Sequence, residues 1–297
     1  MALEKPSELD VAEAKLQRIG RPGASTKTRV VTYRGGDVVR RSDAVATEEP
    51  LEIRLHPGGS DYVSSVTMRT PGNDFELATG WLLAEGIVRH HDDVVKMAYC
   101  VDRTVGEEQR YNIVNVHLRS DLDRDLGSIE RDFFTTSACG VCGKAGLDQL
   151  ATKASRIESQ LSVPPSVVCS LPGKLRAAQG VFERTGGLHA AGLFDSSGEL
   201  IGLREDVGRH NALDKLLGWG LLERKLPLSE CIVLVSGRAS FELAQKSVVA
   251  GVPIMCAVSA PSSMAIDVAS EFDMTLVGFL RDERFNVYAG PERIRAG

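Results

Sequence analysis

The chain has 297 residues, of which 43% are hydrophobic, 25% charged and 5% aromatic, and its formal net charge is −5. These values are typical of a globular protein with a sizeable core, and the negative charge gives no general electrostatic reason to bind nucleic acid. The N-terminus lacks the apolar segment of a secretory signal, and the uncharged stretch between Lys246 and Asp267 is broken by Pro253 and Pro261, so we expect no membrane span and a cytoplasmic location.

The first half of the chain is expected to be rich in β-structure. Residues 1–27 show charge without a clear period, which predicts a mobile N-terminal tail. Asn73 is a favourable helix N-cap, and the apolar stripe after it predicts a packing helix that ends at Gly86. Short Val/Ile/Thr-rich runs predict strands, and we assign residues 28–135 to an N-terminal β-rich subdomain. The expected strands lie within residues 28–41, 51–56, 62–70, 94–101 and 111–118.

The second half alternates between helical and extended patterns. Successive βαβ units of this kind form right-handed crossovers and a largely parallel sheet. We therefore expect an α/β fold class, α+β overall, with residues 136–297 forming a C-terminal α/β domain that contains a cofactor crevice. Helices are expected at 174–185, 207–219, 240–250 and 262–272, and strands at 190–194, 200–203, 231–235, 253–258 and 274–279.

A Cys-x-x-Cys pair lies between these halves. Cys139 and Cys142 are each followed by glycine, and Lys144 comes just beyond them. If a helix starts near Lys144, its macrodipole and the lysine favour the thiolate form of the cysteines. The pair is therefore a candidate for nucleophilic sulfur chemistry on an accessible segment, a chemistry that needs no metal of the protein's own.

Other interpretations of Cys139 and Cys142 stay open on the sequence alone. The two thiols could supply half of a zinc site, cycle between dithiol and disulfide, or be incidental residues of a loop. A thioredoxin-type motif usually follows a strand directly and carries an aromatic residue or proline beside its cysteines, and neither feature is clear here.

His189 is a candidate binding residue among small neighbours. A lone histidine in such a place is often a satisfied core residue. A zinc deaminase would place His-x-Glu before its Pro-Cys-x-x-Cys, but here Ala191 stands at the glutamate position and the two motifs occur in reversed order. The pattern argues against deaminase chemistry.

Arg209 and His210 are expected in the first turn of a helix that follows a strand. Asp206 could cap this helix whatever the function. Two cationic side chains at a helix start oppose the helix dipole, so an anionic ligand would be favoured there.

Two serine loops each follow a predicted strand and open a predicted helix. In parallel sheets such loops lie at the carboxyl edge of the strands, so we expect the two to be neighbours and to cradle a phosphate. The candidate residues are Ser236, Gly237 and Arg238 in the first loop, and Ser259 and Ser262 in the second.

A charged turn with flanking aromatic residues follows the last predicted strand. Asp282 or Glu283 could accept hydrogen bonds from the amino groups of guanine, and Arg281 or Arg284 could bind phosphate. The turn would complete the same crevice.

These motifs together resemble the formate dehydrogenase accessory sulfurtransferase family (FdhD/NarQ). The resemblance runs from about Tyr62 to Ile294, and residues 1–27 lie outside it. It rests on Ser137–Lys144, Arg204–Ala212, Ser236–Ser240, Ser259–Ser263 and Gly278–Arg281.

The resemblance implies a sulfur carrier that takes sulfur from a cysteine desulfurase and delivers it to the molybdenum cofactor, as Mo-bis(molybdopterin guanine dinucleotide), before insertion into formate dehydrogenase. It also implies a C-terminal domain similar to the cytidine deaminase fold, without its zinc chemistry. Cys139 matches the persulfide-bearing cysteine and Cys142 its partner. The segment that matches the cofactor-binding residues is Phe279, Leu280, Arg281, Asp282, Glu283 and Arg284.

Two functions of other classes remain alternatives. One is a non-catalytic chaperone that binds cofactor and molybdoenzyme, and the other is a zinc-binding or redox Cys-x-x-Cys protein. A homodimer is a further expectation, because symmetric dimers are the commonest oligomers of globular proteins.

Overall fold

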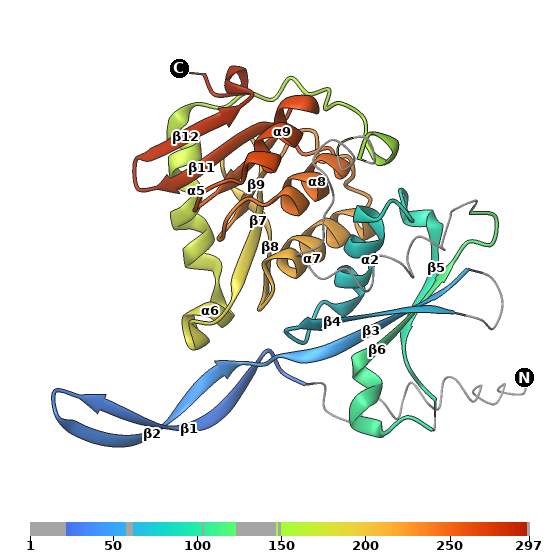
Figure 1. The fold of residues 1–297 in the computed structure, drawn as a ribbon, viewed down its shortest axis with the longest axis vertical. Coiled ribbons are helices and arrows are strands. Elements are labelled where there is room, and N and C mark those ends of the chain that lie inside the picture. The colour runs from blue at the N-terminus through green and yellow to red at the C-terminus, as the bar shows by residue number, and fades with distance from the viewer. Residues whose placement is uncertain (1–21, 58–61, 103, 123–146, 148–149, 296–297) are drawn as a thin grey trace, which may run out of the picture.

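The computed structural model describes residues 22–57, 62–102, 104–122, 147 and 150–295. Figure 1 shows the described elements as stacked layers: helices, a six-stranded sheet, a second layer of helices, and a four-stranded sheet. A long hairpin extends away from these layers. The mixture of helices and sheets confirms the predicted α/β class.

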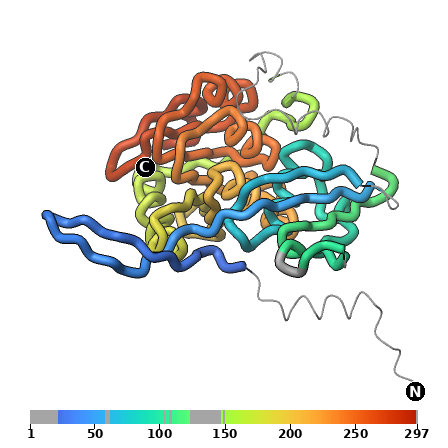
Figure 2. Tube along the Cα trace, turned by 60° about the horizontal axis from the view of Figure 1, so that its bottom comes forward, coloured from blue at the N-terminus to red at the C-terminus, as the bar shows by residue number. Residues whose placement is uncertain are grey.

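The projecting hairpin consists of β1 (Ser25–Arg34) and β2 (Asp37–Ala46), paired in antiparallel register (Figures 1 and 2). Gly35 and Gly36 form its turn with φ of 56° and 96°, in the left-handed region that a two-residue hairpin turn requires. Tyr33 at its end is 78% exposed. We call residues 25–46 the arm; it includes the last three residues of the expected N-terminal tail.

The four-stranded sheet has the order β4-β3-β6-β5. In β3, Leu51, Ile53 and Leu55 alternate with more exposed residues, and they join Leu77 and Leu82 of a neighbouring helix in one core cluster. The strands are β3 (Glu49–His56), β4 (Val63–Arg69), β5 (Val94–Tyr99) and β6 (Ile113–Leu118). The short 3-10 helices η1 (His91–Asp93) and η2 (Glu107–Asn112) lie in its connections.

The helix predicted after Asn73 is confirmed as α2 (Asp74–Ala84). The predicted capping by the Asn73 side chain was wrong. Asn73 adopts the left-handed region with φ 57°, and its side chain makes no capping hydrogen bond. The acidic residues Asp74 and Glu76 in the first turn still complement the helix dipole.

The six-stranded sheet has the order β12-β11-β10-β9-β7-β8. Only β9, β10 and β11 are parallel, so the expectation of a largely parallel sheet was wrong for its flanks. Short connections join β7 to β8 and β11 to β12, and short connections make antiparallel pairs. The strands are β7 (His189–Phe194), β8 (Leu200–Asp206), β9 (Ile232–Val235), β10 (Ile254–Ala257), β11 (Thr275–Arg281) and β12 (Arg284–Ala289).

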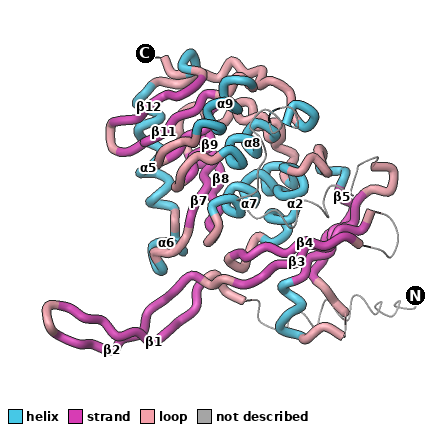
Figure 3. Tube along the Cα trace, viewed as in Figure 1, coloured by secondary structure: helices cyan, strands magenta, loops and turns pink. Residues whose placement is uncertain are grey.

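Helices cover both faces of this sheet (Figure 3). One face packs against α5 (Pro165–Ala178), which is followed by α6 (Gly180–Thr185). These two helices replace the single helix expected at residues 174–185. The other face packs against α7 (Arg209–Leu222), α8 (Phe241–Val249) and α9 (Ser263–Glu271). The 3-10 helix η3 (Pro291–Arg293) comes near the C-terminus.

Helices α2 and α7 pack directly on each other and join the two sheets into one body. The start of β7 and the end of β8 lie at the edge where β9, β10 and β11 end, because β7 runs antiparallel to both neighbours. Among the helices of the described ranges, none has the length and apolar character needed to span a membrane.

Candidate functional site

The candidate site lies at the edge of the six-stranded sheet where the parallel strands end. The carbonyl oxygen of Gly237 accepts a hydrogen bond from the backbone N–H of Ser259 at 3.3 Å, and the carbonyl oxygen of Ser259 accepts one from Phe279 at 3.1 Å. The ends of β9, β10 and β11 are therefore tied side by side. This confirms that the two serine loops are neighbours.

Gly237 lies between two candidate side chains from other elements. A Cβ atom built on it would be 3.6 Å from Nδ1 of His189 and 3.7 Å from Cδ of Arg209. The first residue of β7, the first residue of α7 and the loop after β9 therefore meet at one point. Because glycine has no side chain, the backbone there can approach a ligand closely.

His189 is held beside Ser236. Its Nδ1 lies 3.5 Å from Ser236 Oγ, and this oxygen also accepts a hydrogen bond from the Ala190 backbone N–H at 2.9 Å. Burial lowers the pKa of His189, and the positive charges of Arg209 and His210 lower it further. The imidazole is therefore neutral near pH 7 and can act as a proton acceptor or a hydrogen-bond donor.

Arg209 carries an unsatisfied donor. Its Nε is buried and has no hydrogen-bond partner among the described residues. A buried donor without a partner costs free energy, and an anion that reached it would form a strong charge-assisted hydrogen bond. The guanidinium therefore fits the predicted role of anion binding.

His210 is fixed by a residue that the sequence analysis missed. Nε2 of His210 lies 2.8 Å from the carboxylate of Glu242 and 3.3 Å from Ser240 Oγ. The hydrogen bond from His210 lowers the pKa of Glu242. The sequence shows Glu242 only as an acidic residue in the first turn of a helix, which the helix dipole alone would explain.

The serine candidates differ in what their hydroxyl groups do. Ser262 is the N-cap of α9, and its Oγ accepts a hydrogen bond from the Ala265 backbone N–H at 3.2 Å. Ser240, the N-cap of α8, makes no such capping bond. Arg238 is exposed, and the residues on either side of it, Gly237 and Ala239, are hydrogen-bonded to the second loop. Ser262 thus has a structural role, while the amides at the start of α8 remain suited to an anion.

The β11–β12 hairpin has an unusual backbone. Phe279 and Asp282 are non-glycine residues with φ of 53°, in the left-handed region. The strand pairing is irregular between Gly278 and Arg281, as in a β-bulge. Such strain is found preferentially at functional sites, where it re-aims side chains.

The side chains of this hairpin do not all face solvent. Arg281, Asp282, Glu283 and Arg284 are exposed, and the guanidinium of Arg281 lies 6.0 Å from the centre of the Phe279 ring. Leu280 is fully buried in the core between the sheet and α5. The resemblance implied that Leu280 belongs to the cofactor-binding segment; because its side chain is buried, only its backbone could face a ligand.

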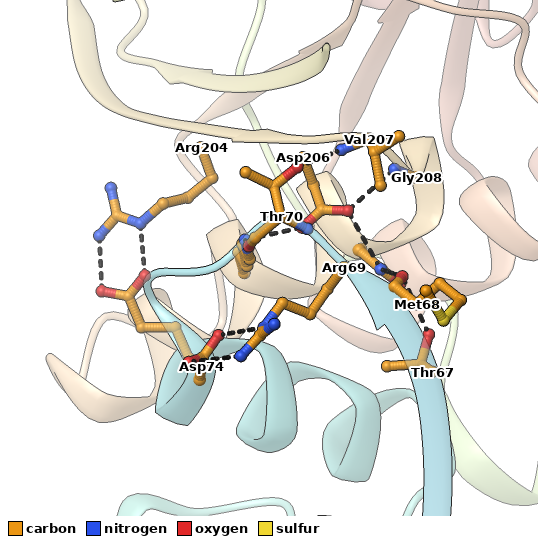
Figure 4. A network of polar contacts seen from close by, with 12 residues as sticks. Thr67, Met68, Arg69, Thr70, Asp74, Arg204, Asp206, Val207 and Gly208 are labelled. Carbon is orange, nitrogen blue, oxygen red and sulfur yellow. Dashed lines mark hydrogen bonds and ion pairs between the residues drawn. The ribbon is translucent and has the colours of Figure 1, made fainter. Parts of the chain in front are cut away.

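The segment that precedes Arg209 has structural roles. The Arg204 guanidinium pairs with the carboxylate of Glu76 on α2, with Nη2 2.7 Å from Oε1 (Figure 4). Glu205 accepts hydrogen bonds from the backbone N–H groups of Val181 and Phe182 at the start of α6. Asp206 does not cap α7 directly, since the N-cap is Gly208. Of this motif, only Arg209 and His210 belong to the candidate site.

Cys139 and Cys142 lie outside the described residues. In the part of the chain that the structure describes, Cys100 and Cys256 are buried and Cys169 and Cys231 are partly buried. Burial raises the pKa of Cys231 and of Cys256, which suits unreactive thiols. Within the described ranges, no three His, Cys, Asp or Glu residues gather as a metal site would require.

Comparison with known proteins identifies the family. The profile of the FdhD/NarQ family matches residues 46–295, which include every motif of the resemblance. The chain belongs to the FdhD/NarQ family. The match includes the Cys-x-x-Cys pair and all residues of the candidate site.

Curated members of the FdhD/NarQ family are similar over nearly their whole length. The "Sulfur carrier protein FdhD" of Streptomyces avermitilis is 51% identical over 271 residues, which cover 90% of this chain and 95% of that protein. The protein of the same name from Sulfurisphaera tokodaii is 44% identical over 268 residues, covering 90% and 98%.

A solved structure supports the same assignment of the fold. A protein from Desulfotalea psychrophila, assigned as a formate dehydrogenase accessory protein, superposes with a TM-score of 0.70 at 25% identity. The superposition covers 92% of this chain and 100% of that one.

Proposed function

We propose that this chain is a sulfur carrier that receives sulfur on Cys139 from a cysteine desulfurase and passes it to a molybdenum cofactor. The observation that carries the proposal is family membership across residues 46–295, with relatives named sulfur carrier protein. The structural relative is assigned as a formate dehydrogenase accessory protein, which supports a molybdoenzyme, formate dehydrogenase or a related one, as the final recipient.

The first step is a thiol–persulfide exchange. The Cys139 thiolate attacks the outer sulfur of the donor's persulfide, the donor's sulfur–sulfur bond breaks, and the donor cysteine leaves as a thiolate. The product is a Cys139 persulfide. In this sense the chain acts as a sulfurtransferase.

The second step releases the sulfur. Cys142 attacks Cys139 Sγ and forms a disulfide, and the outer sulfur leaves as hydrosulfide. The two thiols supply the two electrons that reduce this sulfur, and an external thiol reductant then restores them.

The acceptor, Mo-bis(molybdopterin guanine dinucleotide), would bind as a substrate in the crevice. The unsatisfied Arg209 Nε and the amides at the starts of α7 and α8 suit its phosphates. The exposed β11–β12 turn suits its guanine, with Asp282 or Glu283 accepting from the amino groups and Arg281 or Arg284 near phosphate.

Loading the protein with a desulfurase and isotope-labelled cysteine, followed by mass spectrometry, tests the carrier step. Trypsin cleaves after Arg131 and Lys144, so Cys139 and Cys142 share one peptide. The Cys142→Ala variant separates them: the label should stay on this peptide in Cys142→Ala and disappear in Cys139→Ala. Absence of label from Cys139 would refute the proposal.

The two alternative functions make different predictions. If the chain is a purely structural chaperone, its Cys139→Ala variant should still activate the dehydrogenase. If the chain is a sulfur carrier, that variant should not. A zinc protein would contain stoichiometric metal when freshly purified, and that metal would be lost in Cys139→Ala.

We further infer that two copies of the chain associate through the arm. An isolated two-stranded hairpin is marginally stable in water, and this one exposes Tyr33, Val38 and Val39. Residues 25–46 carry five basic and two acidic side chains in a chain whose net charge is −5, so the arm is complementary in charge to the body of a second copy.

Sedimentation velocity tests this assembly. The Tyr33→Lys/Val38→Lys variant should sediment as a monomer, whereas Val95→Lys, at a comparably exposed valine on β5, should remain a dimer. A wild-type monomer, or a dimer that survives the arm variant, would refute the assignment.

A further inference from the structure

A buried carboxylate connects the candidate site to the other half of the molecule. Asp206 is 0% exposed, and its Oδ2 lies 2.7 Å from Nζ of Lys215, which is 1% exposed. The same oxygen accepts a hydrogen bond from the backbone N–H of Thr70 at 3.0 Å (Figure 4). Thr70 directly follows β4 of the four-stranded sheet, while Asp206 ends β8 of the other sheet.

The second oxygen of Asp206 shapes the turn that leads into α7. Oδ1 accepts hydrogen bonds from the Gly208 backbone N–H at 2.8 Å and from Nδ2 of Asn211 at 3.1 Å. Gly208 is the N-cap of α7. One carboxylate therefore fixes both Thr70 and the first turn of α7.

All three polar groups of Thr70 bind this segment. Besides its N–H on Asp206, its carbonyl oxygen accepts from Lys215 Nζ at 2.8 Å, and its Oγ1 accepts from the Val207 backbone N–H at 3.1 Å. Asn211 adds a hydrogen bond from Nδ2 to the carbonyl oxygen of Met68 at 2.7 Å. The end of β4 is thus joined by hydrogen bonds to the turn before α7 and to α7 itself.

The turn held in this way leads directly into two residues of the candidate site. Arg209 and His210 occupy the first turn of α7, next to the fixed Gly208. We propose that Thr70, through its hydroxyl on the Val207 backbone N–H in the turn that Asp206 and Lys215 also hold, is a positioning residue that sets Arg209 and His210 for ligand binding. The inference rests on the proposed function of the crevice, and it assigns the four-stranded sheet a part in ligand affinity.

The physical basis is the sensitivity of binding to small displacements. Charge-assisted hydrogen bonds to an anion depend on geometry, and a displacement of about 1 Å can reduce function by about 100-fold. Removing the Thr70 hydroxyl leaves the Val207 N–H without its acceptor, so the turn before Arg209 can relax away from the crevice.

The test uses the Thr70→Val variant, which replaces one oxygen by a methyl group. Asp206→Asn is a second variant, but it leaves Lys215 buried without its counter-charge and could unfold the chain. The matched control is Glu76→Gln, which weakens another ion pair between the two halves, that with Arg204.

Three quantities are measured on each full-length protein: the thermal midpoint, the affinity for guanosine diphosphate by calorimetry, and the imidazole NMR signals of His210 without nucleotide. Thr70→Val should bind the nucleotide roughly tenfold more weakly and shift the His210 signals. Glu76→Gln should lower the midpoint while leaving both other quantities unchanged.

The outcomes separate this inference from the proposed function. If the wild-type chain binds no guanosine diphosphate, the proposed nucleotide site fails, and the His210 signals still decide the positioning role. Unchanged His210 signals in Thr70→Val, with or without nucleotide binding, overturn the inference.

Discussion

Gly80 of α2 lies so close to Asp214 of α7 that a Cβ atom built on Gly80 would be 1.8 Å from the Asp214 carbonyl oxygen. Gly218 makes the reciprocal approach, with a Cβ position 1.9 Å from the carbonyl oxygen of Glu76. Both neighbours are backbone atoms, which cannot turn away as a side chain can. The two glycines therefore allow the helices to cross in contact and join the halves of the molecule.

Gly80→Ala should reduce the free energy of unfolding by about 1–3 kcal/mol, because the added methyl group forces the helices apart. Urea denaturation measures this change. Gly173→Ala in α5 is the control, since a Cβ there meets nothing within 4 Å, and it should be neutral or stabilising. Equal stability of Gly80→Ala and the wild type would contradict the close crossing.

Arg69→Met should destabilise the fold by about 3–5 kcal/mol, because it leaves a buried carboxylate without its counter-charge. Arg69 is 0% exposed, and its Nε lies 2.9 Å from Oδ1 of Asp74. The exposed pair of Arg41 and Asp43 on the arm provides the comparison, and Arg41→Met should change stability by less than about 1 kcal/mol. Similar losses in the two variants would refute this ranking.

His189 should make the nucleotide-free protein less stable as the pH falls. Burial lowers its pKa in the folded state below the unfolded value near 6.5, so below that value the unfolded chain binds more protons. The free energy of unfolding should therefore decline as the pH falls from 7 to below the pKa of His189 in the folded state. The His189→Gln variant should lack this part of the decline. Denaturation curves at several pH values that coincide for both proteins would contradict it.

Arg281→Ala should abolish most of the thermal protection that a guanine nucleotide gives to the wild-type chain. The guanidinium is exposed at the β11–β12 turn, where it would be a charge-assisted donor for phosphate in the proposed site. Arg224→Ala is the control, because Arg224 is exposed and paired with Asp92 beyond the far end of α7. Full protection of Arg281→Ala would place the nucleotide elsewhere.

The local parts of the fold were predictable from sequence. The alternation of Leu51, Ile53 and Leu55 indicates a strand with one buried face, and the stripe after Asn73 indicates a helix. The order of strands and helices in the second half was enough to bring Ser236 and Ser259 to one edge of the sheet.

Contacts between distant residues could not be predicted in the same way. The hydrogen bond between Thr70 and Asp206 joins residues 136 positions apart, and neither residue has a local pattern that announces the other. The burial of Leu280 likewise depends on α5 on the far side of the sheet. Glu242 meets His210 only because α7 and α8 begin at the same edge.

The most direct test of the account follows labelled sulfur from protein to cofactor. The chain is first loaded by a desulfurase with labelled cysteine, separated from the donor, and mixed with Mo-bis(molybdopterin guanine dinucleotide) and a thiol reductant. If Cys139 carries the sulfur, label should leave Cys139 of the wild-type chain and appear in the cofactor, and the Cys139→Ala variant should transfer none. Equal transfer by Cys139→Ala would contradict it.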